Sequence, residues 1–259
     1  MKPAVKWLPA PSSKRNITAS PTHSAPDSDS RSLVVAYISC AARGLDCKTN
    51  CVCHEVLEAA TKAIEAGAKI INIAFTQAYI DGLWDNICIQ LKSAFDAKWT
   101  SSVEQPAYSY RHKGPILSFF SPSLGRLMSE AILDPEGVIP STMLTFATPS
   151  GVLCVITTSL PRMPSRARAR LLDSYANAAA QTNADCMLIG GSLDDLNQFT
   201  KLSLQAQVAK LSVDFELVTN SDLYVLACGA HRCLGWSLSE PDNLTVSLLF
   251  KTCAPAQEE

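Results

Sequence analysis

A local cluster of three cysteines and a histidine has the ligand chemistry of a metal site. Cys47, Cys51, Cys53 and His54 follow the pattern C-x-x-x-C-x-C-H. Thiolates and imidazole nitrogens bind zinc, and thiolates also hold iron–sulfur clusters. Structural zinc sites usually carry their cysteines as C-x-x-C pairs, and no second pair follows in this sequence. The alternatives are therefore a metal site and a cysteine-rich loop that leads into a helix, and the spacing favours the loop.

Four arginines surround the start of a predicted helix. They are Arg162, Arg166, Arg168 and Arg170. Guanidinium groups bind phosphate in bidentate geometry, so these side chains could contact a nucleic acid or another phosphorylated ligand. Positions 166, 168 and 170 cannot all point the same way on a helix, which favours a solvated helix face. Positive charge at a helix N-terminus is nevertheless unfavourable, and this leaves a reason to expect a partner there.

The elements that must position such side chains follow an α/β pattern in the first third of the chain. Leu33–Cys40 and Lys69–Phe75 are short apolar runs, which predict strands buried on both faces. Between them, apolar residues recur at helical spacing from Cys53 to Ala66, and a second helical pattern begins at Asp81. Strand, helix, strand, helix indicates an α/β fold, whose ligands bind where the strands end.

The middle of the chain predicts consecutive antiparallel strands, because short apolar runs alternate with turn residues. After Pro164, Ser165 is the expected N-cap of a helix, and a later strand ends at the glycine pair Gly190-Gly191. The predicted strands are Pro115–Phe120, Arg126–Leu133, Thr142–Ala147, Val152–Thr158, Asp185–Ile189, Asp222–Cys228 and Leu244–Phe250, with a further helix at Thr200–Leu211.

Composition limits the class of protein. The chain has 259 residues, 47% of them hydrophobic and 18% charged, which is enough apolar material for one large domain. A net charge of −2 excludes the strongly basic footprint of a nucleic-acid coat protein. We expect a disordered tail at residues 1–31, with an organelle-import signal as an alternative, then one domain at 32–252 and a short tail at 253–259.

The cysteines and the apolar runs bear on location. No run approaches the roughly 20 apolar residues of a membrane span, so we expect no membrane partner. Six of the ten cysteines lie in or beside apolar runs, where cysteine acts as a small hydrophobic residue: Cys40, Cys88, Cys154, Cys186, Cys228 and Cys253. We therefore expect a reducing, intracellular compartment, either cytoplasmic or nuclear, with import into an organelle as the alternative.

The order of these segments resembles the endonuclease/exonuclease/phosphatase superfamily, a fold of metal-dependent phosphodiesterases. The resemblance covers nearly all of residues 33–250. It implies an α/β fold of four layers, in which two packed mixed β-sheets are flanked by helices. The segments that carry it are LVVAYISCAARG, AKIINIAFTQAY, GPILSFFSPSL, GVLCVITTSLPRMPSRARARLLDSYANAAA, ADCMLIGGSLDDL and LSEPDNLTVSLLFK.

The catalytic positions of that superfamily are substituted in this chain. Members hold a divalent metal with oxygen ligands and use a His–Asp pair to move protons. The first strand of the family ends in asparagine, where this chain has Ser39, and the second ends in a metal-binding glutamate, where it has Thr76. The catalytic histidine of the family, which precedes a leucine, corresponds to Ser159. The resemblance therefore places a hydroxyl at each of these three positions.

The two remaining motifs keep an acid. The Gly-Asp-x-Asn motif reads GSLD at residues 191–194, so Ser192 replaces the aspartate and Asp194 stands at the asparagine position. The terminal Ser-Asp-His motif reads SEPD at residues 239–242, which keeps an acid in Glu240 but no imidazole. His231 lies before this motif and is expected to be a loop histidine. Asp194 and Glu240 are thus the candidate catalytic residues.

These substitutions favour a degenerate, non-catalytic protein that needs no cofactor and binds a nucleic acid, a phosphorylated ligand or a protein partner. A hydroxyl does not supply the charge that holds Mg²⁺, and loss of a general base lowers a rate by roughly 10²–10⁴-fold. The alternative is a divergent Mg²⁺-dependent phosphodiesterase or endonuclease, and a third class is an assembly scaffold. In the alternative, the acids that converge are Asp194, Asp195, Asp222 and Glu240, although the first two could simply cap a helix or turn.

Overall fold

The described residues form one compact unit. A computed structural model assigns them to the unit Arg31–Glu259. Both predicted tails, at 1–31 and 253–259, lie outside the described residues. Within the described part of the chain, no helix is long and apolar enough to span a membrane. The structure describes residues 32–40, 49–65, 67–75, 89–94, 109–113, 116–134, 141–193, 198–220, 223–229, 233–235 and 245–251.

The first β-sheet combines strands from the two ends of this unit. Its members are β1 (Ser32–Cys40), β2 (Ala68–Phe75), β3 (Ser109–Lys113), β4 (Ile116–Phe120), β11 (Cys233–Gly235) and β12 (Thr245–Lys251). They are arranged in the order β11-β12-β1-β2-β4-β3. β1 and β2 are parallel, and the other neighbours are antiparallel. The sheet is therefore mixed.

The second β-sheet has the same mixed character. Its members are β5 (Arg126–Leu133), β6 (Ser141–Thr148), β7 (Gly151–Leu160), β8 (Cys186–Leu193), β9 (Glu216–Asn220) and β10 (Leu223–Gly229). The order is β5-β6-β7-β8-β10-β9, and only β7 and β8 are parallel. A parallel pair requires a crossover connection, and helices supply it in both sheets.

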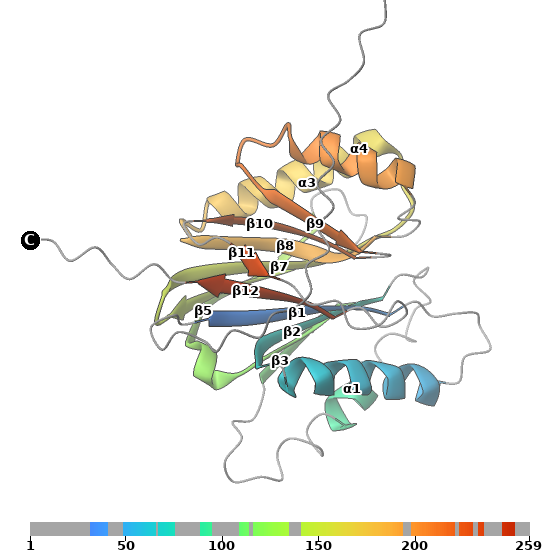
Figure 1. Cartoon of the computed structure of the whole chain (residues 1–259), viewed down its shortest axis with the longest axis vertical. Coiled ribbons are helices and arrows are strands. Elements are labelled where there is room, and N and C mark those ends of the chain that lie inside the picture. Colours follow the sequence, from blue (N-terminus) through green and yellow to red (C-terminus); the bar gives the residue numbers. More distant parts are fainter. Residues whose placement is uncertain are drawn as a thin grey trace, which may run out of the picture. The chain divides into compact units, whose positions relative to one another are not determined.

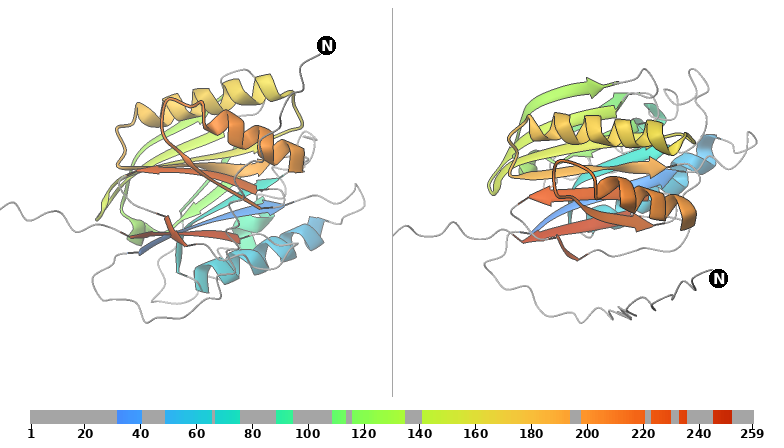
Figure 2. Two further views of the ribbon diagram at one scale, coloured as in Figure 1. Left: turned by 45° about the horizontal axis from the view of Figure 1, so that its top comes forward. Right: turned by 90° about the horizontal axis from the view of Figure 1, so that it is seen from above.

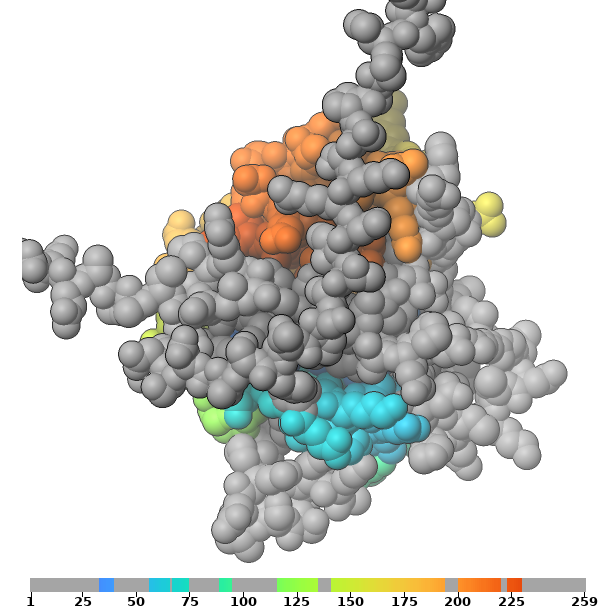
Figure 3. Space-filling view, in the orientation of Figure 1, coloured from blue at the N-terminus to red at the C-terminus, as the bar shows by residue number. Residues whose placement is uncertain are grey.

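The helices cover the outer faces of the two sheets. α1 (Thr49–Glu65) packs on the first sheet, and α3 (Ser165–Ala180) and α4 (Gln198–Val208) pack on the second (Figures 1 and 2). In the space-filling view, the surfaces of α4 and α1 lie on opposite sides of the molecule (Figure 3). The layers thus run helix, sheet, sheet, helix, which confirms the predicted four-layer α/β sandwich.

Three apolar layers hold the sandwich together, because successive side chains of a strand point to opposite faces. Val35 and Ile70 of the first sheet pack against Val155 and Leu188 of the second. Outward-facing strand residues pack instead against the helices, on α1 in one sheet and on α3 and α4 in the other. Strands buried on both faces explain the almost continuous apolar runs in the sequence.

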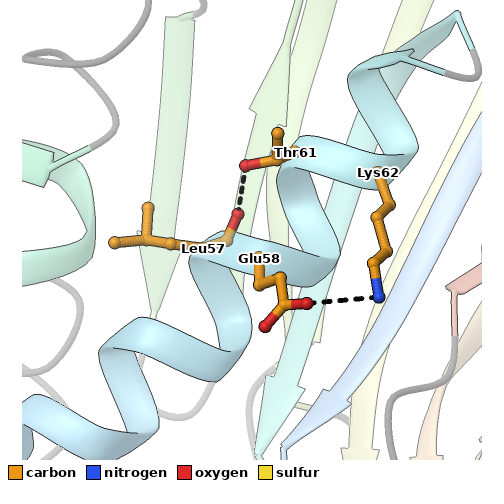
Figure 4. Close-up of polar contacts among 4 residues, drawn as sticks. All are labelled: Leu57, Glu58, Thr61 and Lys62. Carbon is orange, nitrogen blue, oxygen red and sulfur yellow. Dashed lines mark hydrogen bonds and ion pairs between the residues drawn. The ribbon is translucent and has the colours of Figure 1, made fainter.

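The outer face of α1 carries local polar contacts (Figure 4). Thr61 Oγ1 donates to the carbonyl oxygen of Leu57 at 2.6 Å, and Lys62 Nζ lies 3.3 Å from Glu58 Oε1. An exposed i,i+4 ion pair contributes about 0.3–0.5 kcal/mol. The buried inner face therefore provides most of the stability of this helix.

One prediction about the middle of the chain is wrong. The run at Pro115–Phe120 was expected to begin a series of consecutive antiparallel strands, but β4 pairs with β2 and β3 in the first sheet. A single 3₁₀ turn, Pro122–Leu124, separates it from β5 in the second sheet. β5, β6 and β7 are antiparallel neighbours as predicted. A sequence pattern shows where a strand lies but not which sheet it joins.

Three further predictions are corrected at the level of single residues. The strand expected at Asp185–Ile189 does not end at the glycine pair, because β8 continues to Leu193. Pro164 rather than Ser165 is the N-cap of α3, and no side chain in the described part of the chain caps this helix. Cys51 lies in α1 rather than in a loop, because this helix begins at Thr49 and not at the predicted Cys53, and Cys47 lies outside the described residues.

The buried cysteines lead to a test of thiol reactivity. Burial raises the pKa of the Cys154 thiol to about 11, and Cys228 is less buried. At pH 8 a thiol with that pKa is thiolate in only about one molecule in 1,000. We therefore expect iodoacetamide to label Cys228 well before Cys154 in the native protein, as mapped by mass spectrometry. In urea both cysteines should be labelled at similar rates. Equal labelling rates of Cys154 and Cys228 in the native protein would contradict the difference in burial.

Candidate functional site

The two parallel strand pairs end at the same end of the sandwich. β1 and β2 run in the same direction as β8 (Figures 1 and 2), and β7 is parallel to β8. Ligands of α/β folds bind beyond the carboxyl ends of the strands. This end is therefore the candidate functional site, and the last inward-facing side chains of these strands are the residues to consider first.

Ser159 of β7 and Ser192 of β8 form a bonded pair at this end. They are register partners, and Ser192 Oγ donates to Ser159 Oγ at 3.0 Å. The two residues are 4% and 0% exposed. Serine hydroxyls stay neutral at working pH, so the pair can donate and accept hydrogen bonds but brings no charge to a cation. The structure thus brings together two of the positions that the resemblance singled out.

Ser39 of β1 lies at the same end, in the opposite sheet. It follows Tyr37 by two residues, so both side chains face the second sheet. Its Oγ is shielded from solvent and has no hydrogen-bond partner among the described residues. Ser39 therefore places a third neutral hydroxyl at the carboxyl end of the parallel strands.

One step deeper, three polar side chains join the two sheets. Asn72 of β2 accepts hydrogen bonds at its Oδ1 from Ser118 Oγ at 2.8 Å and from Thr157 Oγ1 at 2.9 Å. Ser118 and Thr157 lie 3.4 Å apart between their hydroxyl oxygens. Asn72, Ser118 and Thr157 are all buried, and we call them the Asn72 cluster. This cluster is a neutral polar layer beneath the serines.

Tyr37 lies beside the Asn72 cluster. It is the register partner of Asn72, and its ring packs so closely on β8 that a Cβ at Gly190 would lie 2.9 Å from Tyr37 Cε1. Burial raises the pKa of Tyr37 well above its ordinary value, so the phenol stays protonated. Tyr37 OH and Asn72 Nδ2 are buried without partners among the described residues, which is uncommon for polar groups in a core.

The remaining predicted site residues lie outside the described part of the chain. Thr76 directly follows Phe75, the last residue of β2, and Asp194 directly follows Leu193, the last residue of β8. Glu240 lies in an undescribed segment, as do Asp195, Asp222 and His231. Among the described residues, no three His, Cys, Asp or Glu side chains lie close enough together to hold a metal ion.

Sequence reasoning missed the Asn72 cluster, although a signal was present. Asn72 is the one amide in the apolar run KIINIAF, and Ser118 is the one hydroxyl in ILSFF. A lone polar residue at an inward position of a buried strand must find a partner, because an unpaired polar group in a core is costly. The partner itself could not be inferred, since it comes from the opposite sheet.

Arg168 departs from the expected solvated helix face. Arg162, Arg166 and Arg170 are exposed as predicted, but Arg168 is only 5% exposed. Its Nε donates to Gln207 Oε1 of α4 at 3.1 Å. Arg168 therefore joins the two helices that cover the second sheet.

Solved structures share this fold, although no protein-family profile and no curated protein sequence matches the chain. A humanized TDP2 of D. rerio superposes with a TM-score of 0.57 and 13% identity, over 84% of this chain and 98% of that chain. The catalytic domain of human Nocturnin superposes with a TM-score of 0.54 and 13% identity, over 85% of this chain and 94% of that chain. A Cimex nitrophorin superposes with a TM-score of 0.52 and 13% identity, over 86% of this chain and 99% of that chain.

These three are members of the endonuclease/exonuclease/phosphatase superfamily, so the chain has the fold that the resemblance implied. Solved structures with this fold hold different ligands. D. rerio TDP2 has been crystallised with a single-strand DNA product, Nocturnin with a sulfate anion and the nitrophorin as a ferrous NO complex. Since one fold carries such different ligands, the residues at the site must decide the function.

Proposed function

We propose that this chain is a non-catalytic protein that binds a nucleic acid or another phosphorylated ligand with the endonuclease/exonuclease/phosphatase fold. The bonded pair of Ser159 and Ser192 carries the proposal, because the resemblance expects histidine and aspartate at these positions. Neither hydroxyl can serve as a general base or neutralise Mg²⁺. The Ser39 hydroxyl adds no charge at the same end.

The ligand class follows from the chemistry of related structures and of this end of the sandwich. Phosphate groups accept hydrogen bonds, and the hydroxyl of Ser39, which has no partner among the described residues, can donate one. The single-strand DNA product in D. rerio TDP2 and the sulfate in Nocturnin are ligands of the same anionic kind. A cytoplasmic or nuclear location fits the proposal, because a reducing compartment suits free thiols such as Cys154 and Cys186.

A divergent Mg²⁺-dependent phosphodiesterase is the second candidate. One observation favours it: Asp194 follows β8 directly, two residues beyond Ser192, at the end where the parallel strands converge. A carboxylate there could hold Mg²⁺ if Glu240 approached it from the terminal motif. An assembly scaffold, on whose fold a protein partner docks, is the third candidate. Stoichiometric co-purification of one protein with this chain would support it.

Metal binding and DNA cleavage separate the first two candidates. We expect no saturable heat when Mg²⁺ is titrated into the full chain in a calorimeter. Supercoiled plasmid should be nicked no faster than in buffer, because a protein that lacks both base and metal loses several orders of magnitude in rate.

Acid-to-alanine variants give this experiment its control. Mg²⁺-dependent nicking that is abolished by Asp194→Ala and by Glu240→Ala would overturn the non-catalytic proposal. Asp173→Ala is the matched control, since Asp173 is an exposed acid on α3 whose carboxylate contacts only Asn177 among the described residues. If Asp173→Ala removed the activity as well, the activity would have to be assigned to a contaminant or to a general loss of folding.

A further inference from the structure

A cluster of hydrogen-bond donors lies where α3 meets α4. Arg168 Nη2 donates to Ser203 Oγ at 3.2 Å and to Ser165 Oγ at 3.5 Å. The two hydroxyl oxygens lie 3.0 Å apart, and Gln207 Nε2 also donates to Ser203 Oγ at 3.2 Å. Arginine has five N–H donors, and each serine has one further O–H donor. The cluster therefore contains more donors than its own oxygen atoms can accept.

The guanidinium of Arg168 has no anionic partner in the described part of the chain. Its contacts there are Gln207, Ser203 and Ser165, which are neutral. Tyr224 lies nearby, but burial raises its pKa and its hydroxyl is bonded to Thr158 Oγ1 at 2.8 Å. A cation that is 5% exposed normally has a counter-ion, because an unpaired buried charge is strongly unfavourable.

The start of α3 adds positive character to the same place. No acidic residue lies in its first turn, and Pro164 gives it no side-chain cap. The first intrahelical bond runs from the Arg168 N–H to the Pro164 carbonyl at 3.1 Å, so the N–H groups of residues 165–167 have no intrahelical acceptor. Free N–H groups and the helix dipole attract anions at such an end.

We propose that the start of α3 binds a phosphate group, with Arg168, Ser165 and Ser203 donating to its oxygens. This site extends the proposed function, and the choice of phosphate as its ligand rests on that function. α3 follows β7 after four residues, so the phosphate would bind near the end of the strand that carries Ser159. Ser165 is exposed and Ser203 is half-buried, so an incoming ligand could reach the cluster at these two residues. Phosphate supplies both the negative charge and the acceptors that the cluster lacks.

The test uses the full chain with three probes that share a phosphate group. They are inorganic phosphate, adenosine 5′-monophosphate and a short single-stranded oligodeoxynucleotide, each compared with chloride at equal ionic strength. We expect each probe to raise the unfolding temperature and to bind saturably in a calorimeter. Arg168→Gln should weaken binding by about tenfold or more, since charged hydrogen bonds contribute about 1.5–3 kcal/mol each.

Two other variants separate binding from folding and from bulk charge. The double variant Ser165→Ala, Ser203→Ala removes both hydroxyls near the surface and should weaken phosphate binding even if Arg168→Gln fails to fold. Arg170→Gln removes the same charge from an exposed position two residues along the helix, and its affinity should change less than about twofold.

Each outcome of the experiment decides something. If no probe stabilises the protein beyond chloride, or if Arg170→Gln weakens binding as much as Arg168→Gln, the site is wrong. Unchanged oligonucleotide affinity in the serine double variant would overturn the site and leave the proposed function standing. Mg²⁺-dependent nicking with intact phosphate binding would overturn only the proposed function. If the oligonucleotide binds more tightly than the monophosphate, the site is supported and its ligand is a nucleic acid. If the monophosphate binds more tightly, the site is supported and its ligand is a small phosphorylated molecule.

Discussion

Replacing Gly191 by alanine is expected to lower the free energy of unfolding by about 3 kcal/mol or more. Gly191 has a φ of +147°, a conformation that is essentially restricted to glycine. An added Cβ would overlap the carbonyl oxygen of Thr158, its register partner on β7. This oxygen belongs to the backbone in the middle of a sheet, so it cannot move aside without breaking the hydrogen bonds between β7 and β8.

The matched control is Gly67→Ala. Gly67 also has a positive φ, +85°, but no atom of the described residues lies within 4 Å of an added Cβ there. Backbone strain alone should cost about 1 kcal/mol. Urea unfolding followed by circular dichroism gives both values. Equal losses in the two variants would show that the close contact of β7 with β8 at Gly191 is not as described.

The same glycine connects the fold to the candidate site. Thr158 precedes Ser159 and Gly191 precedes Ser192, so the close approach of the two backbones places the bonded serine hydroxyls side by side. Any relaxation that relieved the overlap in Gly191→Ala would move Ser192 relative to Ser159. A folded variant is therefore also expected to bind its ligand more weakly.

The fold was predictable where the local sequence signal is strong. β1 and β2 are apolar runs of nearly the predicted length, and helical periodicity located α1 and α3. The signal is strong because these elements are buried against a sheet or a helix layer, so their side chains must be apolar.

Other features could not be predicted because they depend on contacts between distant segments. β3 and β9 are five-residue strands without a distinct apolar run, and they were missed. Arg168 was expected in solvent because nothing in its own helix shows that Gln207 of α4 lies within reach. The sheet that β4 joins depends likewise on its partner β2, which lies more than 40 residues earlier in the chain.

The Asn72 cluster provides the second large expected effect. Replacing Asn72 by leucine should lower the free energy of unfolding by about 2–4 kcal/mol, measured by urea unfolding. Leucine is close to asparagine in size but accepts no hydrogen bond, so the hydroxyls of Ser118 and Thr157 would lose the acceptor they share. Ser118→Ala alone should cost about 1 kcal/mol, because Thr157 still donates to Asn72.

Removing every polar member of the cluster should restore stability. In the triple variant Asn72→Leu, Ser118→Ala, Thr157→Val, no hydroxyl is left without an acceptor, and fully apolar replacements of a bonded set are often nearly neutral. We expect the triple variant to recover most of the free energy of unfolding that Asn72→Leu loses. A triple variant less stable than Asn72→Leu would contradict this expectation and show that the cluster holds the sheets together by more than mutual hydrogen bonding.

A stable triple variant would also bear on function. If an apolar layer serves the fold as well as the Asn72 cluster does, the need for polar groups must come from the adjoining site. The unpartnered Asn72 Nδ2 and Tyr37 OH lie directly beneath Ser39, Ser159 and Ser192, where they could anchor water or part of a ligand. The triple variant should then bind phosphate probes less tightly than the wild type while unfolding at a similar urea concentration. Undiminished binding would confine the role of the cluster to the core.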